Sequence, residues 1–195
     1  MNHQTVALAG RLAMASAFAS IPLAYLAFRL EGGGDQAATL GLLIIQVVGV
    51  LLFVAILLLL KKFLNHFFSF HQTNRSMELM ILSNVVASVC VIGGMFIPLV
   101  RESAGVVALA LMVFAGIVQI RFGYQLLKLP SSLGGLHKPF CYLNIATGVC
   151  EASVVLVLAG VVVSAISDLM LATIFFNVHT YLKTVEQAGK TALDQ

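Results

Sequence analysis

Two oppositely charged residues, Arg121 and Glu151, stand inside long apolar stretches of the chain and are the first candidates for chemistry. At 1.5 Å per helical residue, Glu151 lies about 16 Å and Arg121 about 10 Å from the nearest end of its stretch. A carboxylate at such a depth in a membrane must be protonated, paired or hydrated. We therefore expect an ion pair between Arg121 and Glu151, with Tyr124 or Gln119 completing its hydrogen bonds.

Three roles are open for this pair. The ion pair could be structural and fix the packing of two helices. Glu151 could instead take up protons on a transport path, as carboxylates in apolar sites do. Arg121 could bind a lipid headgroup or a small anion, or extend its side chain to the membrane surface. Asn144, Thr147 and Gly148 precede Glu151 at helical spacing, so these four residues share one polar, small-residue face.

Asp168 and His179 form a second candidate group, farther along the chain. They are 11 residues apart, which places them within about 20° of one helix face but about 16 Å apart along it, so they cannot touch. We expect Asp168 in the first turn of its helix, where an acidic side chain is favoured, with Ser164 or Ser167 as the cap. We expect His179 at the membrane interface. A proton relay through Glu151, Asp168 and His179 is the alternative.

The elements that position these residues follow from the composition. Of 195 residues, 60% are hydrophobic and 10% are charged, whereas a soluble domain is about 25% charged. The apolar runs are about 20 residues long and continuous rather than alternating, which indicates spanning helices rather than a barrel. The sequence predicts an all-α polytopic membrane helical bundle, a single transmembrane domain over residues 1–195. Six transmembrane helices in three hairpins are expected, with spans at approximately 12–30, 37–60, 79–99, 105–127, 140–160 and 164–182.

The first span carries a small-residue face. Ala9, Ala13 and Ala17 are four residues apart, a spacing that lets a neighbouring helix approach closely. The basic flank and small residues also fit a signal peptide, but the apolar character continues beyond them, so we expect a retained span. Residues 31–35, Glu-Gly-Gly-Gly-Asp, predict a turn. The boundary placed at residues 161–163, between the last two spans, has neither a charge nor a turn signal.

The connection over residues 63–78 combines aromatic and basic side chains. Its Phe residues recur at helical spacing, which predicts either a short amphipathic helix in the membrane interface or an extension of the second span. Interfacial lipid contacts are expected from Lys61, Lys62, Phe63, Phe67 and Arg75. His66 and His71 are five residues apart, unlike the i, i+4 pair that binds a metal on a helix, so no metal site is expected.

Basic residues favour one side of the predicted bundle. With six spans, the termini and the second and fourth connections share the side that holds Arg11, Lys61, Lys62, Arg75, Lys128, Lys138, Lys183 and Lys190. The opposite side holds Arg29 and Arg101. The positive-inside rule therefore places both termini in the cytoplasm. The compact size and very short loops favour the inner membrane of a bacterium.

The middle hairpin, residues 84–128, resembles the hairpin unit of HdeD-like acid-resistance membrane proteins. The resemblance is an apolar helix that ends near a proline, a short turn, and a second helix with a Gly-Ile-x-Gln-like stretch before basic residues. That stretch is Gly116-Ile117-Val118-Gln119 in this chain. The resemblance covers about a quarter of the chain and implies about six spans arranged as hairpins. The first and third hairpins depart from the pattern, and the family has no established catalytic residues to carry over.

The sequence gives little sign of catalysis. It lacks the GxGxxG, P-loop, HExxH, GxSxG and CxxC motifs, so we lean against an enzyme. Only His179 lies within a predicted span, which disfavours intrinsic haem, and no cofactor is expected. Cys90, Cys141 and Cys150 are odd in number and lie in or beside spans, so we expect unpaired packing residues.

Three hypotheses for the function follow. The first is a non-enzymatic membrane protein with a stress-response or accessory role, acting through helix and lipid contacts. The second is a small transporter or channel that uses Glu151 and Arg121, and it predicts a polar cavity reaching Glu151. The third is the membrane anchor subunit of a redox complex. Expected partners are membrane lipids and either a second copy of the chain or another membrane protein. The net charge of +3 is too small to indicate nucleic acid.

Overall fold

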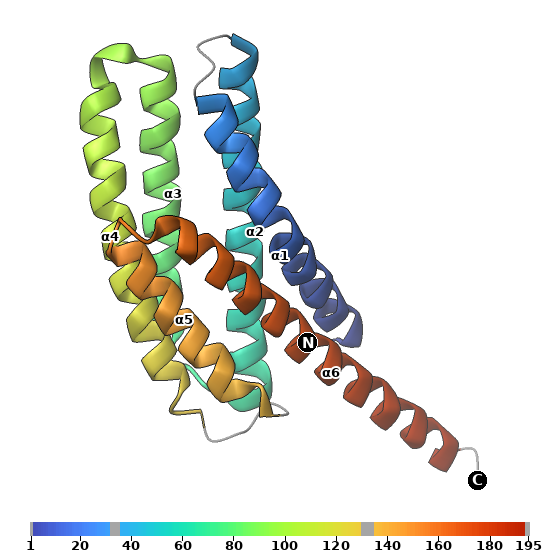
Figure 1. Ribbon diagram of the computed structural model, residues 1–195. Helices are drawn as coiled ribbons and strands as arrows, with labels where there is room; N and C mark the ends of the chain where they lie inside the picture. The colour runs from blue at the N-terminus through green and yellow to red at the C-terminus, as the bar shows by residue number, and fades with distance from the viewer. Residues whose placement is uncertain (1, 32–35, 130–134, 194–195) are drawn as a thin grey trace.

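The computed structural model describes residues 2–31, 36–129 and 135–193, and every regular element within them is a helix (Figure 1). The elements are α1 (His3–Glu31), α2 (Gln36–Phe68), α3 (Asn74–Phe96), the 3-10 helix η1 (Pro98–Val100), α4 (Arg101–Leu126), α5 (His137–Ala152) and α6 (Val157–Leu193). The predicted all-α class is confirmed. Residues 32–35 of the predicted Gly-rich turn lie outside the described residues.

Two antiparallel hairpins and one crossing pair make up the bundle. α1 and α2 form the first hairpin, α3 and α4 form the second, and α5 and α6 cross in front of them (Figure 1). α1 packs most extensively against α6, while α4 packs against both α3 and α5. The start of α1, the end of α6 and the ends of α2 and α4 lie toward the lower end of the view (Figure 1). The end of α1, the start of α2, the end of α3 and the start of α4 lie at the upper end (Figure 1).

Five of the described helices are long and apolar enough to cross a membrane, namely α1, α2, α3, α4 and α6. α5 has 16 residues, or about 24 Å at 1.5 Å per residue, which is shorter than the ~30 Å hydrocarbon core. It rises from the lower end to mid-height, where α6 begins and runs down again (Figure 1). A multi-pass helical membrane protein is therefore supported, whereas six complete spans are not confirmed.

The turn between α5 and α6 lies at residues 153–156, earlier than the predicted boundary at 161–163. Ser153 organises it, because its Oγ donates to the carbonyl oxygen of Cys150 at 2.8 Å and accepts the N–H of Leu156 at 3.2 Å. One hydroxyl therefore links the last turn of α5 to the residue that precedes α6.

The backbone of this turn is satisfied from within the chain. The N–H groups of residues 153–155 donate to nearby carbonyl oxygens. Val154 has φ of 60°, a left-handed conformation that β-branched residues rarely adopt. Val155 is 89% exposed and apolar, as lipid contact requires. Irregular backbone at membrane depth is tolerated here because its donors already have partners.

Phe63 sits at the centre of the core near the lower end. It is fully buried, and its ring lies edge-on to Phe175 of α6 with centroids 5.1 Å apart. It also packs against Phe67 and Phe68. α2 continues as one helix to Phe68, so the extension of the second span is observed rather than a separate interfacial helix. The predicted lipid contact of Phe63 is wrong, because its side chain is fully buried against Phe175 and its aromatic neighbours.

Small residues make the closest helix contacts. The small-residue face of α1 is confirmed by three buried alanines, Ala9, Ala13 and Ala17. On α4, a Cβ added to Gly116 would lie 2.7 Å from the carbonyl oxygen of Gly148 and 2.7 Å from the backbone nitrogen of Ala152, both on α5. The α4 and α5 backbones therefore touch, and this contact fixes the end of α5 that carries Glu151.

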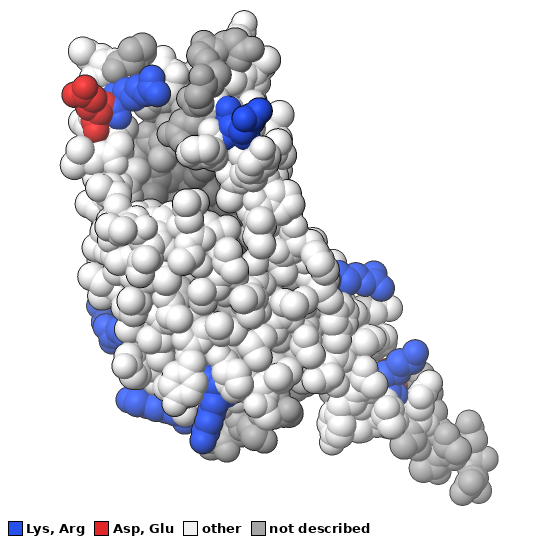
Figure 2. All heavy atoms as spheres, in the orientation of Figure 1, with Lys and Arg blue, Asp and Glu red and all other residues white. Residues whose placement is uncertain are grey.

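A broad band on one face of the molecule carries no charged side chains (Figure 2). On the face drawn in Figure 2, Lys, Arg, Asp and Glu lie at the upper end and in the lower part, with an uncharged band between them. Exposed apolar side chains such as Phe18, Leu51 and Val106 cover the long helices. This distribution is what a lipid environment requires of the surface.

Candidate functional site

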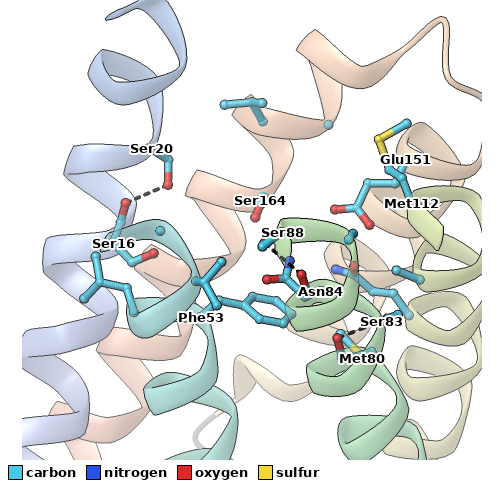
Figure 3. A pocket seen from close by; sticks show the side chains of 18 of the residues that line it. Ser16, Ser20, Phe53, Met80, Ser83, Asn84, Ser88, Met112, Glu151 and Ser164 are labelled. Atoms are coloured by element: carbon cyan, nitrogen blue, oxygen red, sulfur yellow. Dashed lines mark hydrogen bonds between the residues drawn. The ribbon is translucent and has the colours of Figure 1, made fainter. Parts of the chain in front are cut away.

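A cavity of about 760 Å³ lies between the two hairpins and is lined by residues from all six described α-helices. We call it the central cleft. Figure 2 shows the molecule hollowed between the upper ends of the hairpins, and Figure 3 shows the lining side chains from close by. The volume lies within the ~300–1,000 Å³ typical of small-molecule sites.

The polar groups of the central cleft are acidic or neutral. Two carboxylates, four carboxamides and six hydroxyls line it, contributed by Glu151, Asp168, Gln46, Asn84, Gln119, Asn144, Ser16, Ser20, Ser83, Ser88, Ser164 and Ser167. Within the described part of the chain, no Lys, Arg or His lines it. The rest of the lining is apolar. Two acids without a local cation create a negative potential in a medium of low dielectric constant.

Glu151 stands in the last turn of α5 and is half-buried. Its carboxylate points into the cleft (Figure 3). The carboxylate makes no hydrogen bond or ion pair with another described residue. α5 ends at mid-height, so this carboxylate lies deep in the bundle, where an uncompensated charge is costly. The group is therefore open to a proton or to a cationic ligand.

Asp168 faces Glu151 from the other side of the cleft. Ser16 of α1 donates a hydrogen bond from Oγ to Asp168 Oδ2 at 2.6 Å, and Ser20 Oγ donates to the Ser16 carbonyl oxygen at 2.7 Å. In Figure 3, Ser16 and Glu151 lie on opposite sides of the cleft. The prediction of Asp168 as a first-turn acid is wrong, because α6 begins at Val157, three turns earlier.

Amide side chains connect the other walls. Gln46 of α2 donates from Nε2 to Ser88 Oγ of α3 at 2.8 Å, and that hydroxyl donates to the Asn84 carbonyl oxygen at 2.8 Å. The side-chain Oδ1 of Asn84 is buried and has no hydrogen-bond partner. On the α5 side, Asn144 Nδ2 donates to Ser167 Oγ of α6 at 3.1 Å. These groups can accept or donate hydrogen bonds without adding charge.

The predicted ion pair between Arg121 and Glu151 is not formed. Arg121 and Tyr124 are exposed, and neither lines the central cleft. The reason is the orientation of α4 about its own axis. Gly116 and Gly123, seven residues apart, turn one face of α4 toward α5. At 100° per residue, Arg121 points about 140–160° away from both.

The polar face predicted on α5 does point inward. Asn144, Thr147 and Gly148 are buried, and Thr147 Oγ1 donates to the Leu143 carbonyl oxygen at 2.9 Å. Thr147 therefore satisfies its own helix, whereas Asn144 and Glu151 line the cleft. Depth and periodicity were enough to find this face.

The proposed relay to His179 is wrong. The Nδ1 atom of His179 lies 3.0 Å from the His3 carbonyl oxygen, and the residue lines a separate pocket at the start of α1. Asp168 and Glu151 share the central cleft without it.

The predicted interfacial residues other than Phe63 lie near the end of α2 and the start of α3. Lys61 Nζ donates to Glu78 Oε1 at 2.6 Å. Lys62 and Arg75 are exposed, and Phe67 is half-buried against the core. Their contact with lipid stays a prediction.

Gln46, Asn84 and Ser16 were not predicted as site residues. Gln46 is the one strongly polar residue in the interior of its span, whereas Asn84 lies near Ser88 on α3 and Ser16 lies near Ser20 on α1. Polar residues within apolar helices were the available signal. What the sequence could not supply was their convergence from three helices on one cavity.

The fold and the site define a multi-pass helical membrane protein with an acidic cleft between two hairpins. No protein-family model, no curated protein and no solved structure matches the chain. The resemblance of residues 84–128 to HdeD-like proteins therefore stays a prediction. Among the described residues, no group of three or more His, Cys, Asp and Glu side chains could hold a metal ion. The chemistry that the cleft offers is cation binding by carboxylates.

Proposed function

We propose that this protein is a small membrane transporter that binds an amphipathic organic cation in the central cleft and exchanges it for protons. The observation that carries the proposal is a cleft with two carboxylates, Glu151 and Asp168, and no Lys, Arg or His in its described lining. A polar cavity reaching Glu151 is the feature that separates a transporter from a closed accessory bundle.

The charge of the ligand follows from the carboxylates. Each ionised acid inside the membrane needs a compensating positive charge. A proton supplies it when the cleft is empty of ligand, and an ammonium or phosphonium group supplies it when the ligand is bound. Binding and protonation therefore compete for Glu151 and Asp168. Competition of this kind couples the movement of a cation to a proton gradient.

The remaining chemistry of the ligand follows from the walls. Apolar side chains such as Phe53, Met80 and Leu111 line most of the cleft. A hydrated inorganic ion would gain little from such walls, whereas an aromatic or alkyl cation buries apolar surface at about 25 cal/mol per Å². The amides of Gln46 and Asn84 supply hydrogen bonds that orient the ligand.

Transport in reconstituted vesicles tests this proposal. The measurement is ethidium movement into proteoliposomes under a pH gradient, for the wild type, Glu151→Gln and Asp168→Asn. Glu102→Gln is the matched control, because Glu102 is an exposed acid at the start of α4. We expect gradient-driven movement in the wild type and control and its loss in both cleft variants. Wild-type rates equal to those of empty vesicles, or equal rates in all variants, would refute the proposal.

The cellular setting belongs to the same proposal. We place the protein in the inner membrane of a bacterium with both termini in the cytoplasm, on the basis of the positive charges that accompany the termini and the connections after α2 and α4. Self-association stays a prediction. A stress-response role agrees with export of toxic cations, and no separate observation favours the redox-anchor alternative.

A further inference from the structure

A second cavity, of about 510 Å³, lies between the first turns of α1 and the second half of α6. We call it the α1–α6 pocket. Its polar lining is His3, Gln4 and Arg11 from α1 and His179 and Lys183 from α6. None of these residues lines the central cleft. The pocket is therefore a separate site, and the proposed transport function does not use it.

The α1–α6 pocket holds an excess of positive charge. Arg11 and Lys183 are both exposed, and neither forms an ion pair with another described residue. The nearest carboxylate to the lining is Glu186, which lies 3.5 Å from His3 Nδ1. Two permanent cations that face one cavity repel each other unless an anion lies between them.

A hydrogen bond fixes the ring of His179 in the lining of the pocket. A carbonyl oxygen only accepts hydrogen bonds, so the 3.0 Å contact between His179 Nδ1 and the His3 carbonyl oxygen places a proton on Nδ1. This bond holds the ring of His179 beside the two cations. With Nδ1 donating to this carbonyl, Nε2 can donate to an anion only when the ring is an imidazolium, so Arg11 and Lys183 are the groups that define the charge of the site.

The surface above the pocket is apolar and exposed. Phe18 and Tyr25 lie 7 and 14 residues beyond Arg11 and so share its helix face. They are 71% and 62% exposed. A molecule with its charged end at Arg11 and its hydrocarbon part along α1 would match both surfaces, and an anionic phospholipid has this arrangement.

We propose that the α1–α6 pocket binds a phosphate group, carried by the headgroup of an anionic phospholipid or by a free phosphate ester. The Arg11 guanidinium can pair with two phosphate oxygens, and the Lys183 ammonium adds a second positive charge. The bound phosphate would join α1 to α6, the most extensive helix pair in the bundle.

Native mass spectrometry of the delipidated protein tests this proposal. The wild type is mixed with phosphatidylglycerol, phosphatidylcholine or inorganic phosphate, each alone, and compared with the Arg11→Gln/Lys183→Gln variant. Lys128→Gln/Lys138→Gln is the matched control, because both lysines are exposed and flank the α4–α5 connection outside the pocket. We expect the pocket variant to retain at least about fivefold less anionic ligand than the wild type and the control.

The arms of the experiment separate the two sources of phosphate. Retention of phosphatidylglycerol without binding of inorganic phosphate assigns a lipid, and binding of both assigns a site for phosphate itself. Equal retention of phosphatidylglycerol and phosphatidylcholine, or no difference between pocket and control variants, overturns the proposal. Lys183→Glu against Lys138→Glu repeats the comparison with a single charge reversal. Neither outcome depends on the central cleft, so the transport proposal is tested separately.

Discussion

Replacing Gly148 by Ala should destabilise the protein, although the same change stabilises most helices. An added Cβ would lie 2.5 Å from the Gly116 carbonyl oxygen and 2.9 Å from the Ile120 backbone nitrogen. Ordinary contacts of a Cβ begin near 3.4 Å, so α4 and α5 would have to separate by almost 1 Å. These two atoms belong to the backbone and cannot rotate away, and Ile120 Cγ1 lies at 2.9 Å as well.

The expected magnitude follows from two opposing terms. Overpacking a tight contact costs about 1–3 kcal/mol, and the rigid backbone neighbours place Gly148→Ala at the upper end. The higher helix propensity of Ala relative to Gly offsets up to about 1 kcal/mol of this cost. The net destabilisation is about 2 kcal/mol, which corresponds to a fall in Tm of about 4–8 °C for a chain of this length.

Thermal unfolding in detergent, followed with a thiol-reactive dye, measures this effect. The chain has no Trp, and the thiol of Cys141 is fully buried, so its exposure reports unfolding. Gly93→Ala is the matched control, because a Cβ there meets nothing within 4 Å. We expect the control to keep or raise the wild-type Tm. If Gly148→Ala and Gly93→Ala raised the Tm alike, the close contact of α4 and α5 would be refuted.

Three further substitutions test other parts of the structure by the same unfolding assay. Val154→Gly should raise stability by about 1–2 kcal/mol, because it removes a side chain from a residue with φ of 60°, whereas Val155→Gly beside it should not. Phe63→Ala should cost about 3–5 kcal/mol, because it empties a fully buried site in the core, and a loss below 1 kcal/mol would contradict that burial. Arg121→Gln should leave both stability and cation binding near wild type, because the side chain is exposed and unpaired with Glu151. A large loss of stability in Arg121→Gln would instead support a structural ion pair between Arg121 and Glu151.

Composition and periodicity predicted the helical class, the inward face of α5 and the small-residue face of α1. These features depend on residues near one another in sequence, such as Asn144, Thr147 and Glu151 at helical spacing. Each of these predictions uses information contained within one helix.

The predictions that failed depended on relations between helices. The Arg121–Glu151 pair was inferred from depth alone, and depth does not give the direction in which a side chain points. The positions of Gly116 and Gly123 indicate which face of α4 packs against α5, since small residues mark the face on which helices approach each other. The turn after α5 was missed because Ser153 is its one polar residue and Val154 adopts a conformation that sequence patterns assign to Gly.

Equilibrium binding of tetraphenylphosphonium to the purified protein, measured by calorimetry, tests the central claim most directly. The claim predicts saturable binding that weakens as the pH falls, because protons compete for the carboxylates of Glu151 and Asp168. It also predicts at least about tenfold weaker binding, or 1.4 kcal/mol, in the Glu151→Gln/Asp168→Asn variant, with Glu102→Gln unchanged. Binding of equal strength in all three proteins, or none to the wild type at any pH, would contradict a cation site in the central cleft.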